Sequence, residues 1–159
     1  MDLVIVEDSE LIQTQLLRLV ALHGGITVQG VAGDEEGAVS LITASNPDAV
    51  LLDLALAPGS GIHVLQRIRQ AGCTARVLVV TNNTVEVLRR SCEALGISGF
   101  YDKSRDVEAC MDKLFGWLTP STADDAPPAI SPDKPEQVSG RPTNNPPRPS
   151  AVRFQGARP

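Results

Sequence analysis

The sequence has 159 residues and a formal net charge of −5, so it holds one domain with some extra chain and not two full-sized domains. The acidic balance argues against nucleic acid as a default partner, because that binding depends on Lys and Arg neutralising phosphates. Hydrophobic residues make up 42% of the chain and aromatic residues only 3%, so Val, Leu, Ile and Ala must fill the core. The chain opens on an apolar run without a basic segment, and no stretch is as long as a membrane span. We therefore expect a cytoplasmic protein with no signal peptide and no membrane contact.

The three cysteines, Cys73, Cys92 and Cys110, are odd in number and show no CxxC spacing. They indicate neither a disulfide framework nor a zinc site, and we expect them to be small apolar side chains in a reducing compartment. The two histidines, His23 and His63, are expected at the surface. A hydrolase based on serine, cysteine or zinc therefore lacks its parts.

Strands and helices alternate in the first part of the chain. The predicted elements are, in order, a strand at 3–6, a helix capped by Ser9 and ended by His23-Gly24-Gly25, a strand at 26–32, and a helix capped by Asp34 and stopped by Asn46-Pro47. Each helix carries apolar residues on one face, and the Gly and Pro residues supply the stop signals. Carboxylates at Glu35 and Glu36 suit the first turn of the second helix, where the helix dipole is positive.

The same alternation continues to residue 118. The predicted elements are a buried strand in the apolar run 49–56 that ends at Asp53, a helix at 62–71, a strand from 77 to 80 that ends at Thr81, a helix from about Val85 to Gly96, a short strand at 98–101, and a helix capped by Ser104. Val85, Leu88, Cys92 and Leu95 have the spacing of one helix face. Five strands alternating with five helices predict an α/β fold with a parallel sheet covered on both sides, and the pattern leaves the strand order open.

At Thr119 the composition changes. Ten of the twelve prolines lie in residues 119–159, with few large apolar residues and no periodicity. Such a segment cannot bury enough surface to offset its ordering entropy, so we expect a folded domain at 1–118 and a Pro-rich disordered tail at 119–159. Residues 1–118 hold 9 basic and 15 acidic side chains (net −6), and residues 119–159 hold 5 basic and 4 acidic (net +1). A solvated tail is the simpler interpretation, and polyproline II segments that bind a partner are the alternative.

Polar side chains stand at the ends of four of the five predicted strands: Glu7 and Asp8, then Asp53, Thr81 and Lys103. In a parallel sheet these ends converge on one edge, where crowded carboxylates require a cation or a raised pKa. Hard oxygen ligands indicate Mg²⁺. With a hydroxyl and an ammonium nearby, the edge suits an incoming phosphoryl group, with Asp53 as the nucleophile. Each residue alone is explained more simply as a helix cap or surface charge, and only their joint placement favours this function.

Four short motifs occur together on these strands. They are Val4-Ile5-Val6-Glu7-Asp8, Leu51-Leu52-Asp53-Leu54 with Gly61 eight residues after Asp53, Val79-Val80-Thr81, and Gly99-Phe100-Tyr101-Asp102-Lys103. On these motifs, residues 1–118 resemble the receiver domain of two-component response regulators, and in particular a stand-alone receiver of the chemotaxis type. The resemblance implies a doubly wound, flavodoxin-like fold with strand order 2-1-3-4-5.

The resemblance also implies roles for the acids. Asp53 resembles the aspartate that accepts a phosphoryl group from a histidine kinase or a histidine phosphotransfer protein. Asp8 and Asp53 resemble ligands of Mg²⁺, with the backbone carbonyl of Ala55 as a third ligand. Glu7 would act mainly through metal-bound water.

A second group of residues resembles the family's switch. Thr81 resembles the hydroxyl that closes on the phosphoryl group, Lys103 the lysine that pairs with it, and Phe100 the aromatic residue that turns inward when the threonine moves. Phosphorylation would add charge and acceptor oxygens at Asp53 and so bias a two-state equilibrium. The expected output face is the surface from about Val85 to Leu118, where Arg89 and Arg90 are surface charges that could pair with a partner's acids.

The leading hypothesis is a stand-alone receiver that controls an unknown downstream protein or relays phosphate. It would be a phosphoacceptor that catalyses only its own phosphorylation and dephosphorylation, without contacting nucleic acid, and a phosphorylation-dependent homodimer is compatible with it. The second hypothesis is a small Mg²⁺-dependent phosphatase of the haloacid dehalogenase kind, against which Ala55 stands where that family has a second aspartate. The third is an interaction module of the same fold that is never phosphorylated.

Overall fold

The computed structural model describes residues 1–119. The predicted Pro-rich tail therefore falls, apart from Thr119, outside the described residues. The elements are β1 (Asp2–Val6), α1 (Glu10–Ala21), β2 (Thr27–Ala32), α2 (Glu35–Ser45), β3 (Ala49–Leu52), α3 (Gly61–Gln70), β4 (Arg76–Thr81), α4 (Glu86–Ala94), β5 (Gly99–Asp102) and α5 (Val107–Gly116).

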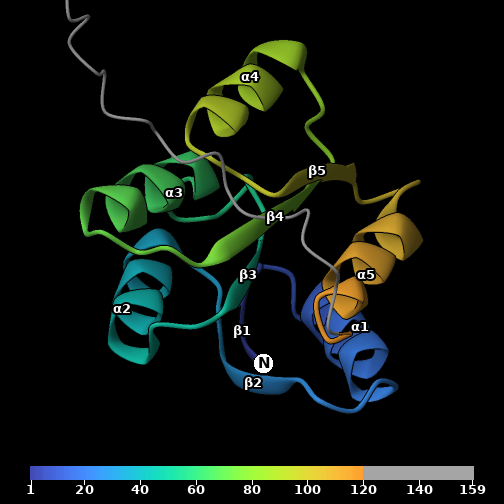
Figure 1. Cartoon of the computed structure of the whole chain (residues 1–159). Coiled ribbons are helices and arrows are strands. Elements are labelled where there is room, and N and C mark those ends of the chain that lie inside the picture. Colours follow the sequence, from blue (N-terminus) through green and yellow to red (C-terminus); the bar gives the residue numbers. More distant parts are fainter. Residues whose placement is uncertain (120–159) are drawn as a thin grey trace, which may run out of the picture. The chain divides into compact units, whose positions relative to one another are not determined.

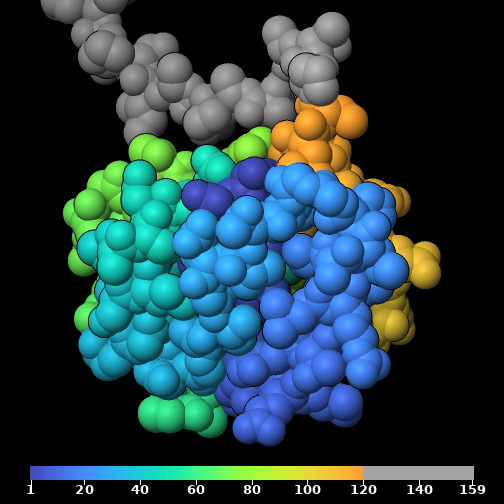
Figure 2. All heavy atoms as spheres, turned by 90° about the horizontal axis from the view of Figure 1, so that it is seen from below, coloured from blue at the N-terminus to red at the C-terminus, as the bar shows by residue number. Residues whose placement is uncertain are grey.

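The five strands form one parallel sheet in the order β2-β1-β3-β4-β5 (Figure 1). This confirms the α/β class, the alternation of strands and helices, and the strand order that the resemblance implies. Viewed from the β2 side, the blue atoms of the N-terminal part make up most of the visible face (Figure 2). No helix within residues 1–119 is long and apolar enough to cross a membrane.

Alternate residues of each strand belong to two separate hydrophobic cores, because successive side chains of a strand point to opposite faces of the sheet. Val4 and Val6 pack with α2, α3 and α4 on one face. Leu3 and Ile5 pack with α1 and α5 on the other. Cys92 and Cys110 are buried in these two cores, Cys73 is half-buried, and all three are free thiols, as expected for small apolar fillers.

The third strand ends close to where it was predicted to end. The sequence places the end of this strand at Asp53, and β3 ends at Leu52. Asp53 still donates its backbone N–H to the Val6 carbonyl at 2.9 Å, and the chain then turns away from the sheet. Leu54 and Leu56 are buried in the core from this loop, which explains why the apolar run continues past the end of the strand.

One helix cap and one predicted core residue differ from the prediction. The last helix is capped at Asp106 and not at Ser104, because the Ser104 N–H donates to Asp102 Oδ1 at 2.7 Å and forms a turn before the helix. Val85 precedes α4 as an extended residue and is 57% exposed, so it does not join Cys92 in the core. Asp34 is confirmed as a cap, since its Oδ1 accepts the Gly37 N–H at 2.8 Å. Ser9 holds the cap position of α1 without a side-chain bond.

Candidate functional site

Three carboxylates meet where β1 and β3 end. Glu7 and Asp8 follow β1 directly, and Asp53 follows β3. One carboxylate oxygen from each lies within 4.8 Å of the others. Glu7 and Asp53 are buried, whereas Asp8 is exposed, so the cluster has a closed side and a side that is open to solvent.

Lys103 is the residue after β5, and its side chain extends into this cluster. Its Nζ lies 2.5 Å from Glu7 Oε2 and donates to Asp53 Oδ2 at 2.6 Å. Burial disfavours the ammonium, but the hydrogen bonds to Asp53 and Glu7 outweigh that effect and raise the pKa of Lys103. Burial also raises the pKa of Glu7, against the lowering effect of Lys103. Lys103 is therefore a lasting positive charge that offsets part of the acidic cluster.

The loop after Asp53 is folded tightly against the start of α3. The Ala55 N–H donates to Asp53 Oδ1 at 3.1 Å, and the Gly61 N–H donates to the Leu54 carbonyl at 3.0 Å. A Cβ placed at Gly61 would overlap the backbone oxygen of Asp53. Gly61 is thus the residue that allows α3 to begin against the backbone of Asp53, which gives a physical reason for its spacing in the sequence motif.

Thr81 and Phe100 come from the neighbouring strands β4 and β5. Thr81 is fully buried, and its Oγ1 accepts the Asn83 N–H at 3.2 Å. The backbone N–H of Lys103 donates to the Thr81 carbonyl at 3.2 Å, so the ends of β4 and β5 are joined. Phe100 is buried in the core beneath α4, with the guanidinium of Arg89 4.6 Å from the centre of its ring.

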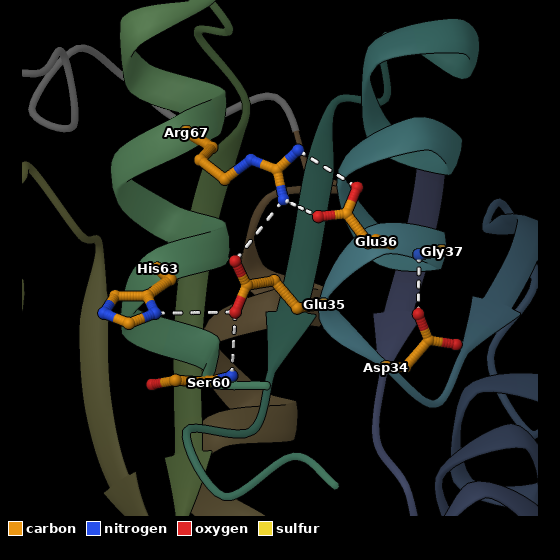
Figure 3. A network of polar contacts seen from close by, with 7 residues as sticks. All are labelled: Asp34, Glu35, Glu36, Gly37, Ser60, His63 and Arg67. Carbon is orange, nitrogen blue, oxygen red and sulfur yellow. Dashed lines mark hydrogen bonds and ion pairs between the residues drawn. The ribbon is translucent and has the colours of Figure 1, made fainter. Parts of the chain in front are cut away.

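A polar network beside the site was not predicted from the sequence (Figure 3). Glu35 and Glu36, interpreted above only as dipole partners, face Arg67 of α3. Arg67 donates to both carboxylate oxygens of Glu36, at 2.5 and 3.1 Å, and lowers the pKa of Glu36. Glu35 accepts the Ser60 N–H at 3.1 Å, and His63 lies 3.5 Å from it while remaining exposed, as expected. The only sequence signal was opposite charge on two helices, which becomes informative once α2 is known to pack on α3.

A second unpredicted cation, Arg69, holds loops on the far side of α3. Its half-buried guanidinium donates to four backbone carbonyls between 2.8 and 3.0 Å, those of Cys73, Ala75, Leu95 and Gly96. Burial lowers its pKa. It joins the loops before β4 and before β5, and so positions two of the strands that end at the site.

A doubly wound parallel sheet whose carboxyl edge carries an acidic cluster and a half-buried lysine is the arrangement of a signal receiver domain. The sequence model of the response regulator receiver domain matches residues 3–115, and the chain belongs to this family. Receiver domains of two-component systems are phosphoacceptors that bind Mg²⁺ at an acidic pocket and interact with histidine kinases or phosphotransfer proteins.

The similar curated proteins include response regulators and an enzyme. The nitrate/nitrite response regulator protein NarP of Escherichia coli is 28% identical over 110 residues, which are 69% of this chain and 51% of NarP. A protein-glutamate methylesterase/protein-glutamine glutaminase of Anaeromyxobacter dehalogenans is 32% identical over 99 residues, 62% of this chain and 29% of that protein. The chain spans about half the length of the first curated relatives that it matches.

Solved structures agree with this fold. The CheX–CheY–BeF3–Mg²⁺ complex from Borrelia burgdorferi gives a TM-score of 0.67 at 26% identity, over 75% of this chain and 90% of that chain. A LuxR-family two-component response regulator from Aurantimonas gives 0.68 at 27% identity, over 74% and 84% of the two chains.

The donor set fits the cation that the family binds. Glu7, Asp8 and Asp53 offer only carboxylate oxygens, the hard ligands that Mg²⁺ prefers, and these oxygens are close enough to share one ion. Lys103 offsets only part of their charge. The cluster therefore remains attractive to a divalent cation.

Proposed function

We propose that this chain is a receiver that accepts a phosphoryl group on Asp53 in the presence of Mg²⁺ and changes its α4–β5–α5 face in response. The observation that carries the proposal is the position of Asp53. It is buried, it is part of a three-carboxylate cluster, and it shares Lys103 with Glu7. A nucleophile and a charge-balancing ammonium in contact are the two parts that phosphoryl transfer to a carboxylate needs.

In the proposed reaction a carboxylate oxygen of Asp53 attacks the phosphorus of a phosphohistidine donor. The new O–P bond forms as the P–N bond breaks, and the electron pair of that bond returns to the imidazole nitrogen. The product is an acyl phosphate on Asp53. Lys103 balances the negative charge on the transferred oxygens, and Thr81 donates its hydroxyl to one of them.

Asp8, Asp53 and the backbone carbonyl of Ala55 would hold Mg²⁺, with Glu7 acting through a metal-bound water. The bound ion supplies charge neutralisation for the incoming phosphoryl oxygens. The Borrelia burgdorferi structure that resembles this chain at 26% identity is a complex with BeF3 and Mg²⁺, which supports the same ligand pair here.

The proposed switch links Thr81, Lys103 and Phe100. When Thr81 and Lys103 turn to the phosphoryl oxygens, the loop between β4 and α4 moves with them, and the space around Phe100 changes. The output face is then read by a protein partner. Direct contact with nucleic acid is not part of the proposal, because residues 1–118 carry 9 basic and 15 acidic side chains.

The alternatives have less support. A haloacid dehalogenase-like phosphatase needs an acid two residues after its nucleophile, and that place is Ala55. An unphosphorylated interaction module would not need a lysine held between two buried carboxylates. Whether the protein works as a stand-alone receiver, and which partner it controls, are properties of the whole protein. The contacts that support the proposal all lie within the receiver domain.

The test is phosphorylation of the full chain by acetyl phosphate with Mg²⁺, followed by intact-mass spectrometry. We expect one added phosphoryl group in the wild type and in the exposed-acid control Asp112→Asn, and none in Asp53→Asn. Label that persists in Asp53→Asn contradicts the proposal. Multiple turnover of a phosphoester would favour the phosphatase, and unchanged Thr81 and Phe100 resonances with beryllofluoride would favour the interaction module.

A further inference from the structure

We propose that Glu35, on α2, is a positioning residue that holds the acceptor loop, defined here as residues 53–60, in the shape that presents the Ala55 carbonyl to the metal site. The inference rests on the proposed function, since it concerns how this chain supports its own Mg²⁺ ligands. It assigns Glu35 no contact with the ion.

The two ends of the acceptor loop are paired with each other. Ala55 forms an isolated antiparallel bridge with Ser60, and its N–H donates to Asp53 Oδ1 at 3.1 Å. The Gly61 N–H closes this bridge by donating to the Leu54 carbonyl at 3.0 Å, so Ala55 and Ser60 are held opposite each other, and we infer that a shift of Ser60 would be passed on to Ala55. Ser60 is the residue that Glu35 holds.

Glu35 contacts three consecutive residues of this loop. Its Oε2 accepts the Ser60 N–H at 3.1 Å, and its own N–H donates to the Pro58 carbonyl at 3.3 Å. Between these two, Gly59 has a φ of +108°, and a Cβ there would collide with the Cβ of Glu35. The loop and the first turn of α2 thus meet without room for a side chain at Gly59.

Glu35 is itself fixed from the other side. Arg67 lies 3.4 Å from its Oε1 and His63 lies 3.5 Å from its Oε2, both from α3 (Figure 3). The Glu35 side chain is only 19% exposed. A carboxylate held by its neighbours and only slightly exposed to water is a stiff support, and such supporting contacts around metal ligands typically change metal affinity by about 10–100-fold when removed.

Glu36 is the natural comparison, because its side chain links α2 to α3 without contacting the acceptor loop through any bond drawn in Figure 3. It makes the shorter and bidentate pair with Arg67, at 2.5 and 3.1 Å, and is 78% exposed. Its carboxylate is directed to Arg67, whereas that of Glu35 also reaches Ser60. If α2 acted only by packing on α3, loss of Glu36 would matter at least as much as loss of Glu35.

The experiment measures Mg²⁺ affinity from the amide resonances of Ala55 and Leu56 during a titration of the full chain with Mg²⁺ alone. Four variants are compared with the wild type: Glu35→Ala, Glu35→Asp, Glu35→Gln and Glu36→Ala. Glu35→Asp keeps the charge but shortens the reach to Ser60, and Glu35→Gln keeps the reach and an acceptor oxygen but loses the charge. Hydrogen exchange of residues 54–60 is followed in parallel.

We expect the dissociation constant for Mg²⁺ to rise about 10-fold in Glu35→Ala and Glu35→Asp. In Glu35→Gln and Glu36→Ala the dissociation constant should remain within about twofold of the wild type. The amide hydrogens of residues 54–60 should exchange faster only in Glu35→Ala and Glu35→Asp. Retained affinity in Glu35→Asp with loss in Glu35→Gln overturns the inference, because charge and not reach would then be responsible. Equal effects of Glu35→Ala and Glu36→Ala also overturn it. A wild type that does not bind Mg²⁺ at all overturns the proposed function as well, so the two failures are distinguishable.

Discussion

Gly61 begins α3 directly against the backbone oxygen of Asp53, in a space that a Cβ would have to share with that oxygen. The two residues are eight positions apart and are linked through the Leu54 carbonyl, which accepts the Gly61 N–H at 3.0 Å. The position of the proposed phosphoacceptor is therefore set by the missing side chain of a residue on the next helix.

Gly61→Ala should displace Asp53 and loosen the start of α3. The obstructing atoms are backbone, which cannot rotate away as a side chain can, so we expect a loss of stability of about 1–3 kcal/mol, typical of overpacking. Urea unfolding gives the free energy, and acetyl phosphate labelling gives the effect on Asp53. Gly116→Ala is the matched control, because a Cβ there meets no other atom within 4 Å. Equal stability of the two variants would contradict the argument.

Much of the site could be predicted because parallel strands deliver their carboxyl ends to one edge. Glu7, Asp8, Asp53 and Lys103 needed only correct strand positions to be grouped, and small errors at strand ends did not separate them. The acid at Asp53 marked the end of β3 to within a residue. The burial of the loop that follows could not be predicted, since Leu54 is as buried in a loop as it would be in a strand.

Contacts between distant residues, and the choice between two possible helix caps, were harder to predict from the sequence. Glu35 and Arg67 are 32 residues apart in sequence and lie on different helices, and charge patterns along one helix do not reveal their pairing. Ser104 and Asp106 are both good cap residues, and the choice was decided by Asp102, whose side chain accepts the Ser104 N–H. Both the ion pair and the helix cap depend on which polar groups lie next to each other in the folded chain.

Arg69→Ala should destabilise the domain more than Arg67→Ala. Arg69 satisfies four backbone carbonyls from two loops, while Arg67 binds carboxylates, one of which is largely exposed. Three of the four bonds of Arg69 are partly buried. Hydrogen bonds to a charged group contribute about 1.5–3 kcal/mol, whereas an exposed ion pair contributes about 0–1 kcal/mol. Urea or thermal unfolding of both variants measures the difference. An order reversed between the two arginines would show that water replaces the lost donor of Arg69.

The three thiols should react at very different rates in the folded protein. Burial raises the pKa of Cys110 to about 12 and also raises the pKa of Cys92. Because only the thiolate reacts, iodoacetamide at neutral to mildly alkaline pH should modify half-buried Cys73 first. Raising the pH towards the pKa of Cys110 should increase its thiolate fraction, while the fold still limits access. Peptide mass mapping measures each site, and denatured protein is the control in which all three react. Equal native rates at Cys73 and Cys110 would contradict the burial of Cys110.

Arg89→Ala should release Phe100, whereas Arg90→Ala should not. Both arginines lie on α4 and face Glu86, but only the guanidinium of Arg89 covers the Phe100 ring. The cation–π contact contributes about 0.5–1 kcal/mol, enough to change the balance between two ring positions about two- to fivefold. Fluorophenylalanine labelling reports it, because the chain has only three Phe residues whose signals can be assigned by mutation. We expect the Phe100 signal to shift and to become more sensitive to solvent in Arg89→Ala alone. A signal that is the same in both variants would mean that the core beneath α4, and not Arg89, holds the ring.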